Sequence, residues 1–255
     1  MSKIKDKFIL GTANFGDKIS FMEAEVILGA FFEKHNSIQT ATNYPMSAQI
    51  PFGSTLNFLK NYLDKNDIKC NLTINIGSLS NNYTDNNDLT PTFFYANFLL
   101  LKEMFPKQNL TLALHWDNKN ESREDLVDLF CELQNEIKIG LSGIEFPANY
   151  SSNKIIYECQ VNSYIDKQRN FMPSTLLKKH LTTSSIIGYQ ILGGRKILFD
   201  RIEKLSDLYG EKDKYKLLLV VLEDNLTRYD KVIIGPKNLE QTLAWLKTAE
   251  VFNEI

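Results

Sequence analysis

The residues best suited to chemistry stand where short apolar runs give way to polar residues. Tyr44 follows the run Ser37–Ala41, and His115 closes the run Leu110–His115. A phenol and an imidazole can each donate or accept a proton, so both positions are candidates for acid–base chemistry. Each also has a plainer interpretation, because Tyr44 precedes Pro45 and could be a loop aromatic, and His115 could be a hydrogen-bonded core histidine.

Apolar runs of this kind recur along the chain, and each leads into a cluster of Gly, Asn, Ser or Thr. They cover Phe8–Gly11, Ser37–Ala41, Cys70–Ile76, Leu110–His115, Ile137–Ser142, Gln160–Tyr164, Ser185–Gln190 and Lys231–Gly235. Between them, Phe21–Lys34 and Arg123–Glu136 carry apolar residues at helical spacing. Strands that alternate with helices predict a parallel sheet. Eight such units in 255 residues predict a (β/α)8 TIM barrel of the α/β class.

Capping and loop signals agree with this architecture. Ser20 with Glu23, and Ser122 with Asp125, have the spacing of helix N-caps. A doubly wound open sheet is the competing fold, but the segment after the first run lacks the expected GxGxxG turn. The polar segment 77–92 predicts a long loop after the third strand. No Pro/Gly-rich linker divides the chain, so residues 1–255 are expected to form one domain.

Composition excludes several classes of function. The 29 basic and 31 acidic residues give a net charge of −2 and are interleaved, so a nucleic-acid partner is not expected. The three cysteines lack the spacing of a zinc site or a disulfide framework, so no metal is expected and a reducing compartment is favoured. No segment reads as a signal peptide or a membrane span, so we expect a cytoplasmic protein without a membrane partner.

The ends of the eight runs, taken in chain order, resemble the aldo-keto reductases, a family of (β/α)8 oxidoreductases. The pieces that carry the resemblance are Gly11-Thr12-Ala13-Asn14-Phe15-Gly16, Thr40-Ala41-x-x-Tyr44, Leu114-His115-Trp116, Gly140-Leu141-Ser142, and Ile234-Gly235 followed by Asn238-x-Glu240-Gln241. The match extends over almost the whole chain. It implies an active site at the C-terminal ends of the barrel strands, where barrel enzymes place their catalytic residues.

The resemblance implies a catalytic tetrad of Asp, Tyr, Lys and His, of which this chain keeps two. Tyr44 and His115 match the Tyr and the His, whereas Gln39 stands at the Asp position and Asn75 at the Lys position. A nearby cation favours a phenolate, which neutral amides do not do. We therefore expect any retained redox activity to be slow and biased toward reduction. We also expect all four side chains to converge at the barrel mouth, with the Asn75 amide in hydrogen-bond reach of the Tyr44 hydroxyl.

The family also implies a cofactor, NADP(H). Tyr189 matches the aromatic that stacks on the nicotinamide, and Ser142 and Gln160 match the residues that bind its amide, although Gly143 stands where an Asn usually follows. Phosphate binding would fall to the matching segment after the last strand and the helix that follows it. The candidate cofactor residues are Gly11, Thr12, Ser142, Gln160, Tyr189, Gly235, Lys237, Asn238 and Gln241.

Two classes of function remain open from the sequence. The first is an NADP-dependent reductase of a carbonyl, or of an activated double bond, in a small metabolite. The second is a catalytically impaired barrel that binds a metabolite or nucleotide, or performs a non-redox reaction. Departures from the family at Gln39, Asn75, Gly143 and Gln241 keep the second class open beside the first. The substrate and the oligomeric state are not indicated by the sequence.

Overall fold

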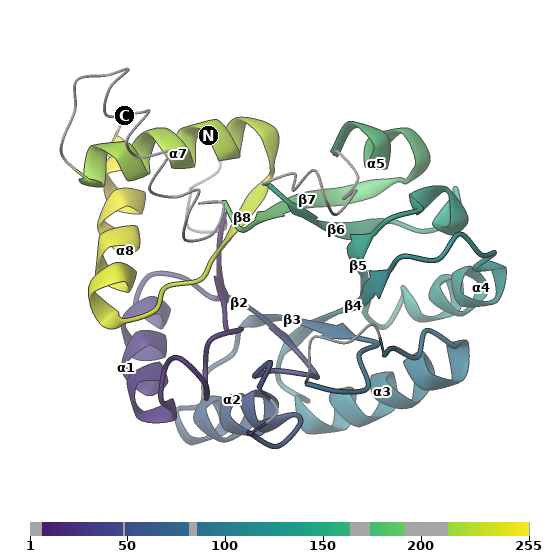
Figure 1. The fold of residues 1–255 in the computed structure, drawn as a ribbon, viewed down its shortest axis with the longest axis horizontal. Helices are drawn as coiled ribbons and strands as arrows, with labels where there is room; N and C mark the ends of the chain where they lie inside the picture. Colours follow the sequence, from purple (N-terminus) through teal and green to yellow (C-terminus); the bar gives the residue numbers. More distant parts are fainter. Residues whose placement is uncertain (1–6, 48, 82–85, 164–173, 192–213, 255) are drawn as a thin grey trace.

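The structure, a computed structural model, describes residues 7–47, 49–81, 86–163, 174–191 and 214–254. Eight parallel strands close into one barrel in chain order, because β1 pairs with both β2 and β8 (Figure 1). The strands are β1 (Phe8–Gly11), β2 (Ser37–Ala41), β3 (Asn71–Ile76), β4 (Asn109–Asp117), β5 (Lys138–Ile144), β6 (Tyr157–Asn162), β7 (Thr183–Tyr189) and β8 (Lys231–Ile234). The predicted (β/α)8 barrel is confirmed.

Helices surround the barrel on its outer side (Figure 1). In the described part of the chain they are α1 (Phe21–Phe32), α2 (Ser54–Lys65), α3 (Pro91–Met104), α4 (Glu124–Leu133), α5 (Ser174–His180), α7 (Lys214–Arg228) and α8 (Leu239–Glu254), with a short 3-10 helix, η2 (Pro147–Tyr150). None of these helices combines the length and the apolar character that crossing a bilayer requires.

The main apolar core lies between the sheet and the helices. Strand β3 illustrates why, since Leu72, Ile74 and Ile76 are fully buried in this core and alternate with Thr73 and Asn75. Alternate side chains of a strand point to opposite faces of a sheet, so the apolar set faces the helices and the polar set faces the barrel interior.

The barrel interior is unusually polar. Thr73 on β3 donates to the Glu158 carboxylate on β6 (3.4 Å), and Ser185 on β7 donates to its other oxygen (3.4 Å). Lys231 Nζ on β8 lies 3.7 Å from Glu158 Oε2. Since β3 and β6 are not neighbours in the sheet, these contacts cross the interior. A small apolar cluster of Ile9, Ile187 and Ile233 lies on β1, β7 and β8.

Two helix N-caps were predicted, and the structure confirms the one at α1 but not the one at α4. Ser20 and Glu23 form a complete capping box at α1, as expected. The second predicted cap, Ser122, is wrong: α4 begins at Glu124 with Arg123 in the N-cap position and no side-chain cap. The reason is tertiary, because the Arg123 side chain binds Asp117 at the end of β4 and this interaction fixes the approach to the helix.

The sixth strand begins three residues and ends two residues earlier than predicted, at Tyr157–Asn162 instead of Gln160–Tyr164. The prediction searched for apolar runs, and Glu158 interrupts the run at a position that faces the polar interior. Tyr164 itself lies outside the described residues. The segment 77–92 joins β3 to α3, and its described part contains an antiparallel bridge between Ser78 and Asn87.

Candidate active site

The C-terminal ends of all eight strands open at the same end of the barrel, because every pairing is parallel. Figure 1 shows this ring of strands with the helices outside it. Tyr44 and His115 therefore belong to the same end of the barrel. Tyr44 lies just after β2, and His115 lies near the C-terminal end of β4. Asn75, Ser142 and Gln160 occupy β3, β5 and β6 near the same end.

Tyr44 is 8% exposed and sits in a turn between β2 and α2. Its backbone N–H donates to Ala41 O (3.2 Å), and its carbonyl accepts from Thr55 N in the first turn of α2 (3.3 Å). The Tyr44–Pro45 peptide bond is cis. The two hydrogen bonds therefore attach the backbone of Tyr44 to the end of β2 and to the start of α2.

Gln39, Gly11 and Thr12 join the first two strands. The Thr12 N–H and hydroxyl both donate to the Gln39 carbonyl, at 3.1 and 3.2 Å. The Gln39 side chain is buried and donates to Thr40 O (3.0 Å). A Cβ atom on Gly11 would lie 2.7 Å from Ile233 Cγ2, so glycine allows β1 and β8 to approach. These contacts give Gly11 and Thr12 a structural role beside their predicted role in cofactor binding.

Asn75 takes part in a closed hydrogen-bond circuit with Ser142 and Gln160. Asn75 Nδ2 donates to Ser142 Oγ and to Gln160 Oε1, both at 3.2 Å. Gln160 Nε2 donates back to Asn75 Oδ1 (3.1 Å), and Ser142 Oγ donates to Gln160 Oε1 (3.1 Å). The Asn75 amide therefore binds two residues of the barrel interior, Ser142 and Gln160, and its proximity to the Tyr44 hydroxyl stays a prediction.

His115 is buried, and loss of hydration lowers its pKa to about 3. The imidazole is therefore neutral at physiological pH. Within the described residues its Nδ1 atom has no hydrogen-bond partner. The ring packs on Trp116 with the centroids 4.1 Å apart. A neutral imidazole in this position can hydrogen-bond to a substrate oxygen without bringing a charge into the barrel.

Other polar atoms close to these strand ends also lack a partner in the part of the chain that the structure describes. They belong to Thr40, Thr42, Asn43 and Ser78, and both polar atoms of the Asn43 side chain are included. Buried polar groups are nearly always satisfied in folded proteins. This end of the barrel is therefore chemically suited to bind a polar ligand. No signal in the sequence singled these residues out.

The end of β4 carries an ion-pair cluster that sequence reasoning missed. Arg123 binds the Asp117 carboxylate through two hydrogen bonds (2.8 and 2.9 Å), and the Tyr150 hydroxyl donates to it at 2.5 Å. Burial alone would raise the pKa of Asp117, but the Arg123 and Tyr150 hydrogen bonds, the Lys119 N–H and the Arg123 charge outweigh burial and hold that pKa below its usual value. The available signal was an Asp directly after Leu-His-Trp, at the end of the strand.

Trp116 lies between His115 and this cluster in an unusual backbone conformation. Its φ of 58° is in the left-handed region, which large side chains rarely adopt. Asn87, from the loop between β3 and α3, donates to the Trp116 carbonyl at 2.6 Å. The backbone of Trp116 is therefore held by the hydrogen bond from Asn87 and by the next residue, Asp117, which binds Arg123. The Trp116 ring packs against His115.

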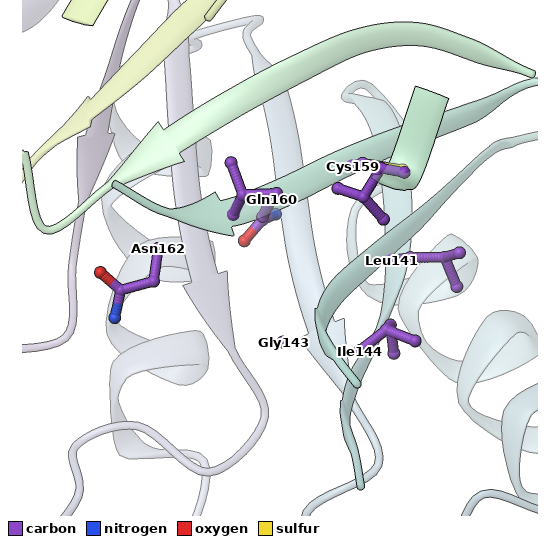
Figure 2. A pocket seen from close by; sticks show the side chains of 8 residues that line it. Leu141, Gly143, Ile144, Cys159, Gln160 and Asn162 are labelled. Atoms are coloured by element: carbon purple, nitrogen blue, oxygen red, sulfur yellow. The ribbon is translucent and has the colours of Figure 1, made fainter. Parts of the chain in front are cut away.

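A small, partly open hollow lies at the ends of β5 and β6, beside α5. Figure 2 shows the Gln160 and Asn162 amides on one side of it and Leu141 and Cys159 on the other. Gly143, also in its lining, has a φ of 66°, a conformation that Gly and Asn tolerate best. The hollow therefore adjoins the Asn75–Ser142–Gln160 circuit on the β6 side.

The remaining predicted cofactor residues lie on β7 and on the connection from β8 to α8. Tyr189 is half-buried against the interior apolar cluster. Asn238 Oδ1 accepts from Gln241 N (2.9 Å), and Gln241 Oε1 accepts from Lys237 N (2.8 Å), so both side chains organise the start of α8. Among the described residues, a Cβ atom on Gly235 would meet nothing within 4 Å.

Comparison with known proteins identifies the fold. The chain resembles a Pseudomonas aeruginosa protein named for the aldo-keto reductases (TM-score 0.63, 16% identity, 96% of this chain and 91% of that one). It also resembles the thermostable aldo-keto reductase Tm1743, solved with the inhibitor epalrestat (TM-score 0.60, 16% identity, 95% and 89%). The apo aldo-keto reductase AKR11C1 from Bacillus halodurans is a third example (TM-score 0.60, 16% identity, 96% and 86%).

At the level of sequence, no family model and no curated protein matches the chain. The structural likeness extends over nearly the whole chain and confirms, at the level of the fold, the resemblance inferred from the strand ends. The protein is thus a closed (β/α)8 barrel with the aldo-keto reductase fold.

Proposed function

We propose that this protein is an oxidoreductase of the aldo-keto reductase type, which reduces a carbonyl group, or an activated double bond, of a small metabolite with NADP(H). The observation that carries the proposal is the presence of Tyr44 and His115, both buried, at the same end of a barrel with this fold. A phenol that donates a proton and a neutral imidazole that orients the substrate oxygen are the two groups that carbonyl reduction needs from the protein.

The protein's own part in the reaction follows from these two groups. The Tyr44 hydroxyl donates its proton to the substrate oxygen as that oxygen gains negative charge. His115 polarises the same oxygen through a hydrogen bond, and its neutrality keeps it from competing as an acid. Because Gln39 and Asn75 carry no charge, nothing at these two positions stabilises a phenolate, and the reductive direction is favoured.

The cofactor assignment is supported by the donor set of the barrel mouth. Ser142 and Gln160 already bind one carboxamide, the side-chain amide of Asn75. Nicotinamide carries the same functional group. When bound, the reduced nicotinamide would supply the hydride. Ser142, Gln160 and Tyr189 would hold its ring, and Gly235, Lys237, Asn238 and Gln241 its phosphates. Lys237 is the cationic side chain of that segment, which supports NADP(H) over NAD(H).

One observation favours the second candidate, a catalytically impaired barrel that binds a metabolite. Ser142 and Gln160 are satisfied by Asn75 and are only 3% and 4% exposed, so they need no ligand for their hydrogen bonds. A barrel with this closed circuit could bind a polar metabolite at its mouth without using a redox cofactor.

Fluorescence titration with NADPH, followed by an aldehyde and ketone panel, separates the two candidates. The reductase should bind NADPH and reduce at least one carbonyl substrate. Tyr44→Phe should then lower the turnover rate by about 100-fold or more while cofactor binding stays unchanged, because only the proton donor is lost. Tyr95→Phe is the matched control, since Tyr95 is 44% exposed on α3. A protein that binds no NADPH would favour the impaired barrel.

A further inference from the structure

Asn75, Ser142 and Gln160 satisfy one another almost completely. They come from three different strands and are 2%, 3% and 4% exposed. The Asn75 amide nitrogen donates to two acceptors and its carbonyl oxygen accepts one hydrogen bond, and Gln160 Oε1 accepts two hydrogen bonds. One N–H of Gln160 and one lone pair of Ser142 are not used within the circuit.

Ser142 and Gln160 together form a receptor for a primary carboxamide. Ser142 Oγ and Gln160 Oε1 each accept from the Asn75 amide nitrogen, and Gln160 Nε2 donates to the Asn75 amide oxygen. This set of acceptors and donor complements a carboxamide on both of its sides. A second carboxamide arriving at the pair would find only one donor and one hydroxyl lone pair remaining.

We propose that Asn75 is a built-in occupant of this carboxamide receptor, and that a nicotinamide ring has to displace it in order to bind with its full set of hydrogen bonds. The inference rests on the proposed function, because it takes the nicotinamide cofactor as the ligand. Asn75 thereby acts as a specificity-determining residue, which lowers the affinity for cofactors that carry a carboxamide and leaves other ligands of the mouth unaffected.

Replacing Asn75 by Ala tests the proposal directly. The variant frees both acceptors and the donor of the Ser142–Gln160 pair, so NADPH should bind about five- to tenfold more tightly by fluorescence titration, the effect of one or two hydrogen bonds gained. The acetylpyridine analogue of NADPH, which carries a methyl ketone in place of the amide, lacks the N–H donors and should gain little. The readout is a dissociation constant and needs no turnover.

Asn71→Ala is the matched control. Asn71 lies on the same strand as Asn75, but at the opposite end of the barrel, where its amide binds Asn36 and Ser37. Its removal should leave both dissociation constants unchanged. If Asn75→Ala does not fold, Asn75→Ser keeps a small polar group at the site and should show the same selective gain.

The outcomes separate this proposal from the proposed function. Equal NADPH affinity in the wild type and in a folded Asn75 variant overturns the occupant role but keeps the reductase assignment. Binding by the variant alone supports the occupant role and overturns reductase function in the wild type. Absence of binding in both overturns both. A further outcome concerns the wild-type protein by itself. If it bound NADPH more than about tenfold more tightly than the acetylpyridine analogue, the proposal would be overturned, because a receptor occupied by Asn75 cannot hydrogen-bond to the cofactor amide.

Discussion

At the scale of single residues, the state of His115 is set by burial. The imidazole loses hydration inside the barrel, and its pKa falls to about 3. An unfolded histidine titrates near pH ~6.5, so folding has to keep a proton off this residue throughout the mildly acidic range. As a result, the His115 imidazole at the barrel mouth can form hydrogen bonds while it carries no charge.

This leads to a pH-dependent stability. Between about pH 6.5 and pH 3 the unfolded chain binds one more proton than the folded chain at His115, so stability falls as the pH decreases through this window and is complete above it. His115→Gln should remove this slope, worth on the order of a few kcal/mol at its acid end. Urea unfolding midpoints measured from pH 4 to pH 8 provide the check.

His180→Gln is the matched control, because His180 lies outside the barrel at the end of α5. Its unfolding midpoints should follow those of the wild type. Wild-type and His115→Gln curves that run parallel over the whole range would show that His115 does not contribute to the acid sensitivity.

At the scale of elements, the connection from β4 to α4 is fixed by charge. Asp117 is 1% exposed, and the Arg123 side chain that binds it is 12% exposed. The pair holds the loop that carries Trp116, whose backbone is strained. The Tyr150 hydroxyl also donates to the Asp117 carboxylate, so η2 is attached to the same point.

Breaking this pair should be costly. Arg123→Met leaves the Asp117 carboxylate buried without its cation, so the free energy of unfolding should fall by about 3 kcal/mol. Lys107→Met is the control, because Lys107 forms an exposed pair with Asp67 and such pairs contribute little. Urea denaturation of both variants at neutral pH compares the two. Equal losses would contradict the role assigned to Asp117 and Arg123.

At the scale of the whole molecule, barrel closure depends on small residues as well as on polar layers. Gly140 on β5 faces Ala113 on β4, and a Cβ atom there would lie 2.8 Å from Ala113 Cβ and 3.1 Å from Glu158 O. The strands approach one another at this level because neither residue has a large side chain. The interior above it is filled by the Asn75–Ser142–Gln160 circuit.

The same chemical change should therefore have opposite effects at two positions. Gly140→Ala overpacks the barrel and should lower the free energy of unfolding by about 1–3 kcal/mol. Gly29→Ala lies within α1, where the new Cβ makes an ordinary contact 3.7 Å from the Tyr62 hydroxyl, and should raise it by about 0.5–1 kcal/mol. Thermal and urea unfolding of both variants measure the signs. A stabilised Gly140→Ala would contradict the packing argument.

The sequence by itself determined the features that depend on neighbours along the chain. The apolar run Cys70–Ile76 indicated a strand, and Ser20 with Glu23 indicated the start of α1. Eight such units in order sufficed for the barrel and for placing Tyr44 and His115 at strand ends. These signals are local, because hydrophobic period and capping act over a few residues.

Only the tertiary structure decided which polar groups meet. Asn75 and Gln160 are 85 residues apart, and their hydrogen bonds depend on the curvature that brings β3 opposite β6. No local signal in the sequence indicated that Asn75 binds Gln160, or that Arg123 binds Asp117 in place of a cap at Ser122. Contacts of this kind are set by barrel closure, which no local pattern encodes.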